Sequence, residues 1–437
     1  MQIRRSRLLA GLAAVAAATL VLTGCAGGGS GTKSDTLTYT DNVPKDKVTL
    51  QVWSFLPGNY EGGAEAYDKV IAAFNEKYPQ VTIKLTDMPY STYWDQLRNS
   101  GVSRSGPDVV TMYGGAQAYS YRNSLFPMQN AMSPEVKKDL RYIDENYSKD
   151  GNLYMLPVGA YGYAFLVNQS LFEKAGLDAQ KSLATWDGML QACTTFKEKG
   201  IPAIASGWQD GIQLETLLYM ISSQLMDTET LAKWTKGELP FNDPLFHTVI
   251  DRVLEMNKAG CFGGEEALGK AMYNDAFDQF DAGKAALSLG GGLDRAENDF
   301  KSIPSLTVIP MPQAPESKHE NLIDAGADAG WAVTKWTKSP EAANAFVNFL
   351  AGPEAQQILW DTVHVVPNNN GVDVQLTTPM QKVYIPLIMN PENHTGFSSF
   401  SLELLAVVER NAGPLISGKM SVDQFFEQAN RAYEKNN

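Results

Sequence analysis

The stretch from Leu153 to Gly176, LYMLPVGAYGYAFLVNQSLFEKAG, decides the fold. Leu156-Pro157 ends one element, because proline has no N–H for a sheet ladder and disfavours helix at the residue before it. Residues 159–163, GAYGY, are typical of a glycine-loosened extended segment. Residues 164–167 then begin a short apolar strand that leads into a helix. The stretch therefore predicts a chain that crosses from one lobe to another and at once starts a new strand and helix.

The same residues resemble a known family. LYMLPVGAYGYAFLVNQSLFEKAGLD, followed by ATWDGMLQACTTFKEKGIPAIASG, resembles the central block of the extracellular solute-binding proteins of sugar ABC transporters, the maltose-binding-protein-like group. GPDVVTMYGG and AFDQFDAGKAALSLGGG resemble further signatures of that family, and the likeness runs from Val48 to the C-terminus. Val167-Asn168-Gln169 departs from the family's Y-N-K-like triplet. The resemblance implies an α/β, two-lobe periplasmic-binding-protein-like fold of type II, with several inter-lobe crossings and a ligand cleft between the lobes.

Alternating strand and helix patterns on either side of this stretch predict two α/β lobes. Before it, we expect strands at 48–55, 81–85 and 108–112 and helices at 64–78 and 92–101. After it, we expect a helix at 185–200 and strands at 201–206, 284–289 and 306–309. Glycines predict a second crossing at 325–333, and a third crossing is expected between 388 and 400. Lobe 1 then comprises 48–162 and 333–390, and lobe 2 comprises 163–332 and 391–437.

Length and charge narrow the possible functions. A chain of 437 residues is too long for one ordinary core and predicts two domains. Its 36 Lys and Arg against 49 Asp and Glu give a net charge of −13. Such a charge argues against nucleic acid or an anionic lipid surface as a partner.

The N-terminus has the pattern of an export signal. Arg4, Arg5 and Arg7 precede an apolar run, Leu8–Leu22, that is too short for a comfortable spanning helix. Leu22-Thr23-Gly24-Cys25 resembles a bacterial lipobox, which implies a signal peptide at 1–24, a diacylglyceryl group on Cys25 and a flexible tether at 25–47. We therefore expect an exported protein held on the outer face of the cytoplasmic membrane by lipid alone, in a Gram-positive type of envelope. An ordinary signal peptide with a fortuitous cysteine is the alternative.

Export also bears on the other two cysteines, Cys193 and Cys261. They are an even pair in an oxidising compartment, so a disulfide between them is possible. Two buried thiols are the alternative.

Catalytic and metal-binding motifs are missing from the sequence. No G-x-S-x-G, H-E-x-x-H, Walker A or G-x-G-x-x-G stands between a strand and a helix, and the four histidines are scattered. Carboxylate pairs such as Asp278 with Asp281 are more typical of solvated helix faces than of a glycosidase. We therefore predict a non-enzymatic protein with no metal and no cofactor.

Aromatic and glycine residues instead recur at strand ends and crossings, where ligands bind in open α/β sheets. A sugar ring needs flat aromatic platforms for its C–H face and polar side chains for its hydroxyl rim. The same aromatics could instead pack between the lobes or in the cores. The predicted ligand-binding residues are Trp53, Ser54, Glu61, Tyr113, Gly114, Tyr161, Trp208, Gln209, Asp210, Gly291, Gly292, Asp294, Asp328, Trp331 and Phe397.

The resemblance and the predicted site together indicate a monomeric, lipid-anchored subunit that binds an oligosaccharide and delivers it to the permease of an ABC importer. One alternative keeps the fold and binds a peptide, a polyamine or a metal complex, which would need charged anchors. A secreted glycan hydrolase would need two carboxylates facing each other across the cleft. A surface adhesin is a fourth reading, disfavoured by a closed small-ligand pocket.

Overall fold

The computed structural model describes residues 36–290, 292–298, 300, 302–303, 305–319, 322–393 and 400–435. By its internal contacts the chain divides into Met1–Ser34 and Asp35–Asn437, and every element described here belongs to the second unit. The predicted signal peptide and Cys25 lie outside the described residues. None of the described helices has the length and apolar content needed to cross a lipid bilayer.

The first sheet has five strands in the order β2-β1-β3-β10-β4. β1 pairs in parallel with β2 and β3, whereas β10 is antiparallel to both β3 and β4. A Cβ on Gly330 would lie 2.0 Å from the backbone oxygen of Leu156, so only glycine lets β10 approach β4 this closely. The strands are β1 Val48–Ser54, β2 Val81–Asp87, β3 Val109–Met112, β4 Leu156–Pro157 and β10 Gly330–Val333.

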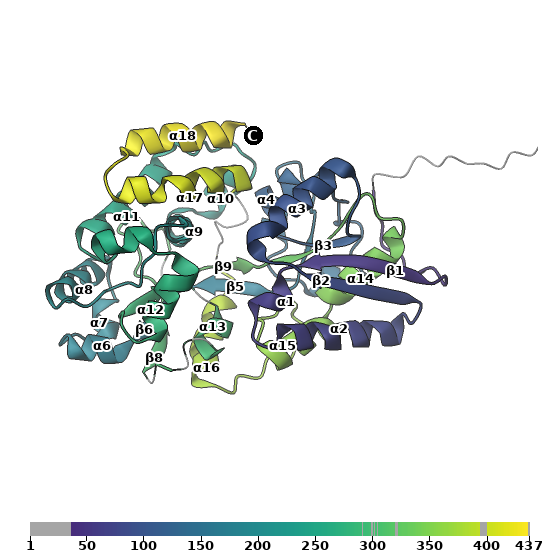
Figure 1. Cartoon of the computed structure of the whole chain (residues 1–437), viewed down its shortest axis with the longest axis horizontal. Helices are drawn as coiled ribbons and strands as arrows, with labels where there is room; N and C mark the ends of the chain where they lie inside the picture. Colours follow the sequence, from purple (N-terminus) through teal and green to yellow (C-terminus); the bar gives the residue numbers. More distant parts are fainter. Residues whose placement is uncertain are drawn as a thin grey trace, which may run out of the picture. The chain divides into compact units, whose positions relative to one another are not determined.

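The first core is the buried apolar cluster around this sheet, and it includes Leu50, Val52 and Phe74. Leu50 and Val52 alternate with more exposed residues along β1, the period-2 pattern of a strand with one buried face. The helices of this part are α1 Leu56–Asn59, α2 Gly63–Lys77, α3 Tyr90–Ser103, α4 Gly115–Ser120, α5 Pro134–Asp139, α14 Pro340–Ala351 and α15 Pro353–Val363, with the 3₁₀ turn η1 Asp144–Asn146 (Figure 1).

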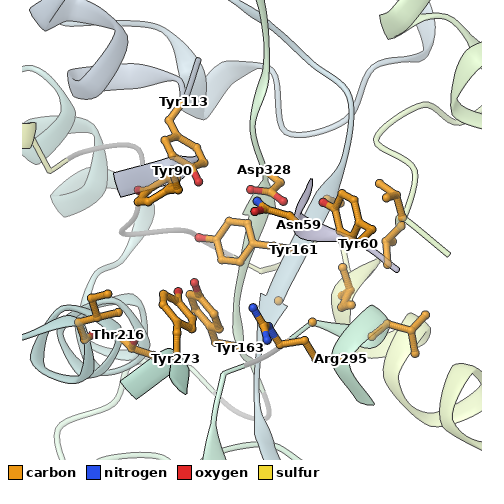
Figure 2. A pocket seen from close by; sticks show the side chains of 18 of the residues that line it. Asn59, Tyr60, Tyr90, Tyr113, Tyr161, Tyr163, Thr216, Tyr273, Arg295 and Asp328 are labelled. Atoms are coloured by element: carbon orange, nitrogen blue, oxygen red, sulfur yellow. Dashed lines mark hydrogen bonds between the residues drawn. The ribbon is translucent and has the colours of Figure 1, made fainter. Parts of the chain in front are cut away.

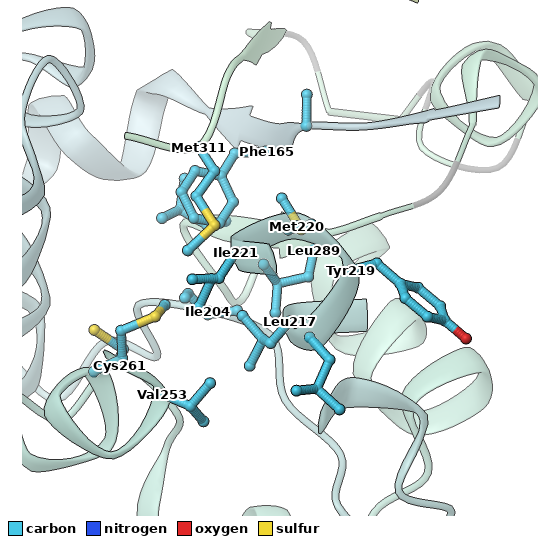
Figure 3. Packing of buried hydrophobic residues seen from close by; sticks show 14 of the residues in the cluster. Phe165, Ile204, Leu217, Tyr219, Met220, Ile221, Val253, Cys261, Leu289 and Met311 are labelled. Atoms are coloured by element: carbon cyan, nitrogen blue, oxygen red, sulfur yellow. The ribbon is translucent and has the colours of Figure 1, made fainter. Parts of the chain in front are cut away.

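The second sheet is antiparallel, with strand order β7-β6-β8, where β6 is Phe165–Asn168, β7 Leu287–Leu289 and β8 Leu306–Ile309. Phe165 and Leu289 join Leu217, Ile221 and other apolar side chains in the second core (Figure 3). The remaining helices are α6 Gln169–Lys174, α7 Ala179–Ser182, α8 Trp186–Glu198, α9 Ile212–Leu225, α10 Thr228–Thr235, α11 Pro244–Lys258, α12 Phe277–Asp281, α13 Leu293–Asn298, α16 Pro379–Ile388, α17 Leu402–Ile416 and α18 Val422–Glu434, with the short turns η2 Gly264–Gly269 and η3 Met272–Ala276.

A disulfide joins Cys193 of α8 to Cys261, which follows α11. Both sulfurs are buried in the second core. Of the two alternatives, a disulfide or two buried thiols, the structure contains the disulfide.

The predicted first and second crossings meet in a two-stranded antiparallel sheet of β5, Ala160–Tyr163, and β9, Asp324–Ala327. The chain runs from β4 in the first sheet through β5 to β6 in the second sheet, and it returns through β9 to β10. β5 and β9 lie side by side in Figure 1. Glycine is needed at 162, because a Cβ there would lie 2.8 Å from Ile388 and 2.9 Å from Ile323.

Three sequence expectations about the elements are wrong. Leu37 and Val43, in the predicted tether, are buried in the first core. Residues 201–206 form no strand, only an isolated bridge between Ile204 and Leu287. The third crossing lies before α16, because Tyr384 and Ile385 pack in the second core, so residues 379–388 do not belong to the first lobe as predicted.

Candidate functional site

A cavity of about 340 Å³ lies beside the β5–β9 pair, between elements of the two cores. Its walls on the first side come from the end of α1, the start of α3 and the residue after β3. On the second side they come from α9, η3, α13 and α17. The cavity is therefore built where the chain crosses between the sheets, and its size falls within the range of small-ligand sites.

Tyrosines make up much of its wall. Figure 2 shows them converging from both sides, with Tyr90 and Tyr113 opposite Tyr163 and Tyr273 and with Tyr161 between them. Each ring offers a flat face and a hydroxyl, the combination that suits a ligand with an apolar face and a polar rim. The six tyrosines of the lining are Tyr60, Tyr90, Tyr113, Tyr161, Tyr163 and Tyr273.

Neighbouring aromatic rings hold these tyrosines in place. Tyr113 follows β3, and its ring centroid lies 5.8 Å from that of Phe55 and 5.7 Å from that of Trp94. Tyr161 and Tyr163 of β5 lie 5.1 Å apart, and the Tyr161 hydroxyl donates to Asp324 at 3.1 Å. Such packing fixes ring orientation before a ligand arrives.

The tyrosine hydroxyls are protonated near neutral pH, and desolvation moves their titration further into the alkaline range. Desolvation raises the pKa of Tyr163 and Tyr113 well above the usual value, and it raises the pKa of Tyr273 to about 12. These hydroxyls therefore remain hydrogen-bond donors throughout the physiological pH range.

Charged side chains in the cavity include three carboxyl groups and one guanidinium. The Arg295 guanidinium lies over the rings of Tyr273 and Phe277, 5.5 and 5.0 Å from their centroids. Burial raises the pKa of Asp328, although the Ala329 N–H opposes that shift. Glu215 of α9 and Glu409 of α17 are the other two carboxyl groups.

His364 also lines the cavity, at a joint between the two parts. It caps the C-terminus of α15 in the left-handed conformation, with a φ of 56°. Its Nδ1 lies 2.9 Å from a carboxylate oxygen of Glu297 in α13. Thr378 and Gln381, at the start of α16, donate to the same carboxylate. This network ties the end of α15 to α13 and α16.

Four of the predicted ligand-binding residues line the cavity: Tyr113, Tyr161, Gly292 and Asp328. Gly291 and Phe397 lie outside the described residues, and so does the side chain of Asp294.

Three predicted residues are buried in the cores, away from the lining. Trp331 is fully buried in the first core, edge-on to Tyr67 at 5.9 Å. Trp208 packs edge-on against Phe262 in the second core, with centroids 5.1 Å apart. Ser54 accepts from the Thr111 hydroxyl inside the first sheet. None of these three residues lines the cavity, because sequence does not show which face of a strand or loop a side chain takes.

The other five predicted residues are also absent from the lining. Trp53 packs against the outside of the first core, and Glu61 is exposed in the turn before α2. A Cβ on Gly114 would lie 1.8 Å from the Asn146 side chain, so this glycine serves packing. Gln209 is exposed, and Asp210 accepts the backbone N–H groups of Met272 and Ile212.

Several lining residues were missed by the sequence prediction. Tyr90 and Tyr273 stand at the start of a helix and in a helical turn, where aromatics are usually read as packing. Glu215 and Glu409 lie 194 positions apart in amphipathic helices, so only the tertiary structure brings them together. Partial exposure of Tyr90 at 47% and Tyr273 at 41% marks them as available to a ligand. Tyr163 could have been predicted as a lining residue from its place in the crossing segment, two residues after Tyr161.

The geometry agrees with the comparisons to known proteins. Residues 69–382 match the family described as bacterial extracellular solute-binding protein.

This chain belongs to that family. The match covers more than half of the sequence and confirms the resemblance carried by residues 153–176 and the blocks around them.

Two relatives extend the likeness. An uncharacterized ABC transporter extracellular-binding protein of Pyrococcus horikoshii is 22% identical over 388 residues, 86% of this chain and 82% of that protein. The sn-glycerol-3-phosphate-binding periplasmic protein UgpB of Shigella flexneri is 25% identical over 326 residues, 70% of this chain and 71% of that protein.

Solved structures confirm the two-lobe α/β fold class. A chitin oligosaccharide binding protein superposes with a TM-score of 0.76 at 20% identity, covering 90% of this chain and 99% of that one. The solute-binding protein RafE in complex with raffinose gives a TM-score of 0.64 at 18% identity, covering 89% of this chain and 99% of that one.

Among the described residues of this chain, no three His, Cys, Asp or Glu side chains are placed to hold a metal ion.

Proposed function

We propose that this extracellular solute-binding protein is the oligosaccharide-binding subunit of an ABC importer. The observation that carries the proposal is the cavity walled by six tyrosines from both parts of the molecule, beside the strands that join them. A ligand that touches both walls at once stabilises the arrangement in which they face each other. The permease, on a separate chain, then receives the loaded protein.

The wall chemistry favours a neutral, hydroxyl-rich ligand. Tyrosine faces suit the C–H face of a pyranose, and their hydroxyls and the carboxyl groups suit its rim. The chitin-oligosaccharide and raffinose-bound neighbours support this reading.

A phosphate ester is less well matched, although one relative is named for sn-glycerol-3-phosphate. Phosphate sites use Arg or Lys in fork-like or clustered contacts. The only guanidinium in this lining, Arg295, stacks on Tyr273 and Phe277 and shares the cavity with three carboxyl groups. A polyamine or peptide would be drawn by those carboxyl groups, but burial favours the neutral form of Asp328.

The arrangement of the acidic groups also favours a binding protein over a glycosidase. Glu215 and Glu409 share a hydrogen bond. The carboxyl groups of a glycosidase stand about 5 to 10 Å apart, with the scissile bond between them. A pair already in contact leaves no space for that bond.

The N-terminal sequence supports an anchor. With Cys25 lipidated after removal of residues 1–24, the protein stays on the outer face of the membrane as a monomer attached only through lipid. Cys25→Ala should release it into the medium and abolish incorporation of labelled fatty acid. A variant that stays bound to the membrane and labelled would refute the anchor.

The ligand can be tested with a panel of neutral oligosaccharides, sn-glycerol-3-phosphate and spermidine, read by thermal shift and then calorimetry. A ligand at 100 times its Kd stabilises the native state by about 2.7 kcal/mol, so a true ligand raises Tm. We expect at least one oligosaccharide to bind and to remain intact after incubation. Tight binding of the phosphate or polyamine alone, or cleavage of the sugar, would overturn the proposal.

A further inference from the structure

We propose that Glu215 and Glu409 share one proton in the cleft and that solute is held tightly only while this proton is present. Capture would then be stronger in mildly acidic surroundings. The inference rests on the proposed function, because it assigns the two carboxyl groups a role in the same cavity.

The two carboxyl groups are brought together by helix packing. Glu215 lies in the first turn of α9, and Glu409 lies in α17, which packs against α9. Gly211, with a φ of 75°, caps α9, and a Cβ there would lie 2.1 Å from the backbone oxygen of Glu409. The start of α9 therefore sits directly on the α17 backbone at Glu409, one turn of helix away from Glu215.

The contacts of the pair match a shared proton. The side chains of Glu215 and Glu409 hydrogen-bond to each other, which requires a proton on one of them. The Tyr219 hydroxyl donates to Glu215 Oε1 at 2.6 Å and so supplies the donor that a charged oxygen needs. Both carboxyl groups also line the cavity. The pair therefore presents donor and acceptor capacity at the ligand surface.

Electrostatics oppose loss of that proton. Burial, followed by the contact with Glu409, raises the pKa of Glu215 well above its usual range, and burial also raises the pKa of Glu409. Like charges in contact cannot both ionise easily, so the two groups titrate as a pair. Asp210, in the loop before α9, adds a further negative charge that acts on both groups.

Other titratable groups face the pair from the elements around it. Tyr90 of α3, Tyr163 of β5 and Tyr273 of η3 are neutral near pH 7, and desolvation and the charge of Glu215 raise the pKa of each hydroxyl further. Arg295 of α13 lies over the Tyr273 ring, and its charge opposes the rise in the pKa of Tyr273.

On the helices packed against α9 and α17, charged side chains pair with one another. Arg252 binds Glu255 on α11, and Arg431 binds Glu427 on α18. Ser120 of α4 donates to Glu403 of α17 at 3.2 Å.

Loss of the shared proton would remove a donor and add a second negative charge to the cavity wall. A sugar hydroxyl both donates and accepts, so it pairs well with a carboxyl–carboxylate pair and less well with two carboxylates. Ligand affinity should therefore fall as pH rises through the upper titration of the pair.

The test uses the mature protein and the tightest oligosaccharide of the panel, with Kd measured by calorimetry from pH 5.5 to 8.5. We expect Kd to rise at least about tenfold across this range, because loss of one required proton weakens binding by up to tenfold per pH unit. Glu409→Gln supplies a permanent amide donor, so its Kd should vary less than about threefold. Glu403→Gln, a carboxyl change on the same helix outside the cavity, should keep the wild-type slope.

A ligand-free measurement separates this inference from the proposed function. A carboxyl group whose pKa is raised in the folded protein stabilises it below the ordinary pKa, and that contribution is lost as pH rises through the folded value. Wild-type Tm should therefore fall with rising pH more steeply than that of Glu215→Gln or Glu409→Gln.

If no panel sugar binds but this difference in Tm slope appears, the proton pair stands and the oligosaccharide proposal fails. If sugar binds with a flat pH profile, or if Glu409→Gln keeps the wild-type slope of Kd, the inference is overturned.

Discussion

Each tyrosine of the cavity wall offers a ligand an apolar ring face and a hydroxyl group. The ring of Tyr113 is held against Phe55 and Trp94, and its hydroxyl is protonated at neutral pH, with its pKa raised further by desolvation. A single side chain thus provides a flat apolar face and a donor without a formal charge.

Tyr113→Ala should weaken oligosaccharide binding by about 1 to 3 kcal/mol, because it removes a buried aromatic wall and its hydroxyl. Calorimetry on the folded variant measures the change. Tyr119→Ala is a matched control, since Tyr119 lies beneath Arg122 and Lys149 and outside the cavity lining. Equal losses in the two variants would contradict the site.

Trp331, by contrast, lies in the first core and not in the cavity wall. It is fully buried against Tyr67, and its indole N–H has no hydrogen-bond partner within the part of the chain that the structure describes. Trp331→Ala should lower the free energy of unfolding by about 3 to 5 kcal/mol through the cavity it leaves. Trp331→Phe provides a milder version that retains the fold, and its Kd for sugar should stay within about twofold of wild type. A large loss of affinity with unchanged stability would return this residue to the ligand site.

At the level of elements, the β5–β9 pair and the junctions around it position the cavity. β5 carries two of the six tyrosines, and Asp328 directly follows β9. The α9–α17 contact adds the two glutamates. The cavity is therefore a product of neighbouring elements that are far apart in sequence.

The disulfide between α8 and the end of α11 should contribute to the stability of the second part. It links residues 68 positions apart, and removing such a link typically costs about 2 to 5 kcal/mol. Cys193→Ala with Cys261→Ala should lower Tm and leave sugar affinity unchanged, because neither cysteine lines the cavity. Wild-type protein treated with reductant should show the same drop in Tm, and no drop in either sample would contradict a stabilising role.

At the level of the whole molecule, buried carboxyl groups shape the pH dependence of stability. Burial, aided by Asp324 and Asp144, raises the pKa of Glu145 well above 4.5, and burial raises that of Asp328 above 3.8. Their stabilising contribution is present below those ordinary values and is lost as pH rises through the folded values. Asp227 acts in the other direction, because hydrogen bonds from Lys318 and Thr230 lower its pKa in the folded protein. Its contribution to the free energy of unfolding is therefore present above 3.8 and is lost as pH falls below that value.

We therefore expect the ligand-free protein to be most stable at acidic pH, near about pH 4. The urea midpoint measured from pH 4 to pH 8.5 should peak there and fall toward alkaline pH. Glu145→Gln should flatten the alkaline limb, while Glu341→Gln, at an exposed position in the first turn of α14, should not. A midpoint that rises steadily to pH 8.5 would contradict this account.

The sequence by itself determined the family, the two α/β parts and the first two crossings. Those features depend on local signals such as the Leu156-Pro157 break, the glycines around Tyr161 and the alternation along β1, and such signals survive in short windows of sequence. It also brought Tyr113, Tyr161, Gly292 and Asp328 into the predicted site, because strand ends and crossings are where ligands bind in this architecture.

Only the tertiary structure decided which aromatics face the cavity, where the third crossing lies, and that Glu215 meets Glu409. Trp331 and Tyr113 follow similar local patterns, yet one packs on Tyr67 in the first core and the other faces the open space. The surroundings of a side chain are set by contacts between helices and strands that are far apart in the sequence. A short window of sequence does not contain those distant segments, so it cannot show whether the side chain will meet a core or a cavity.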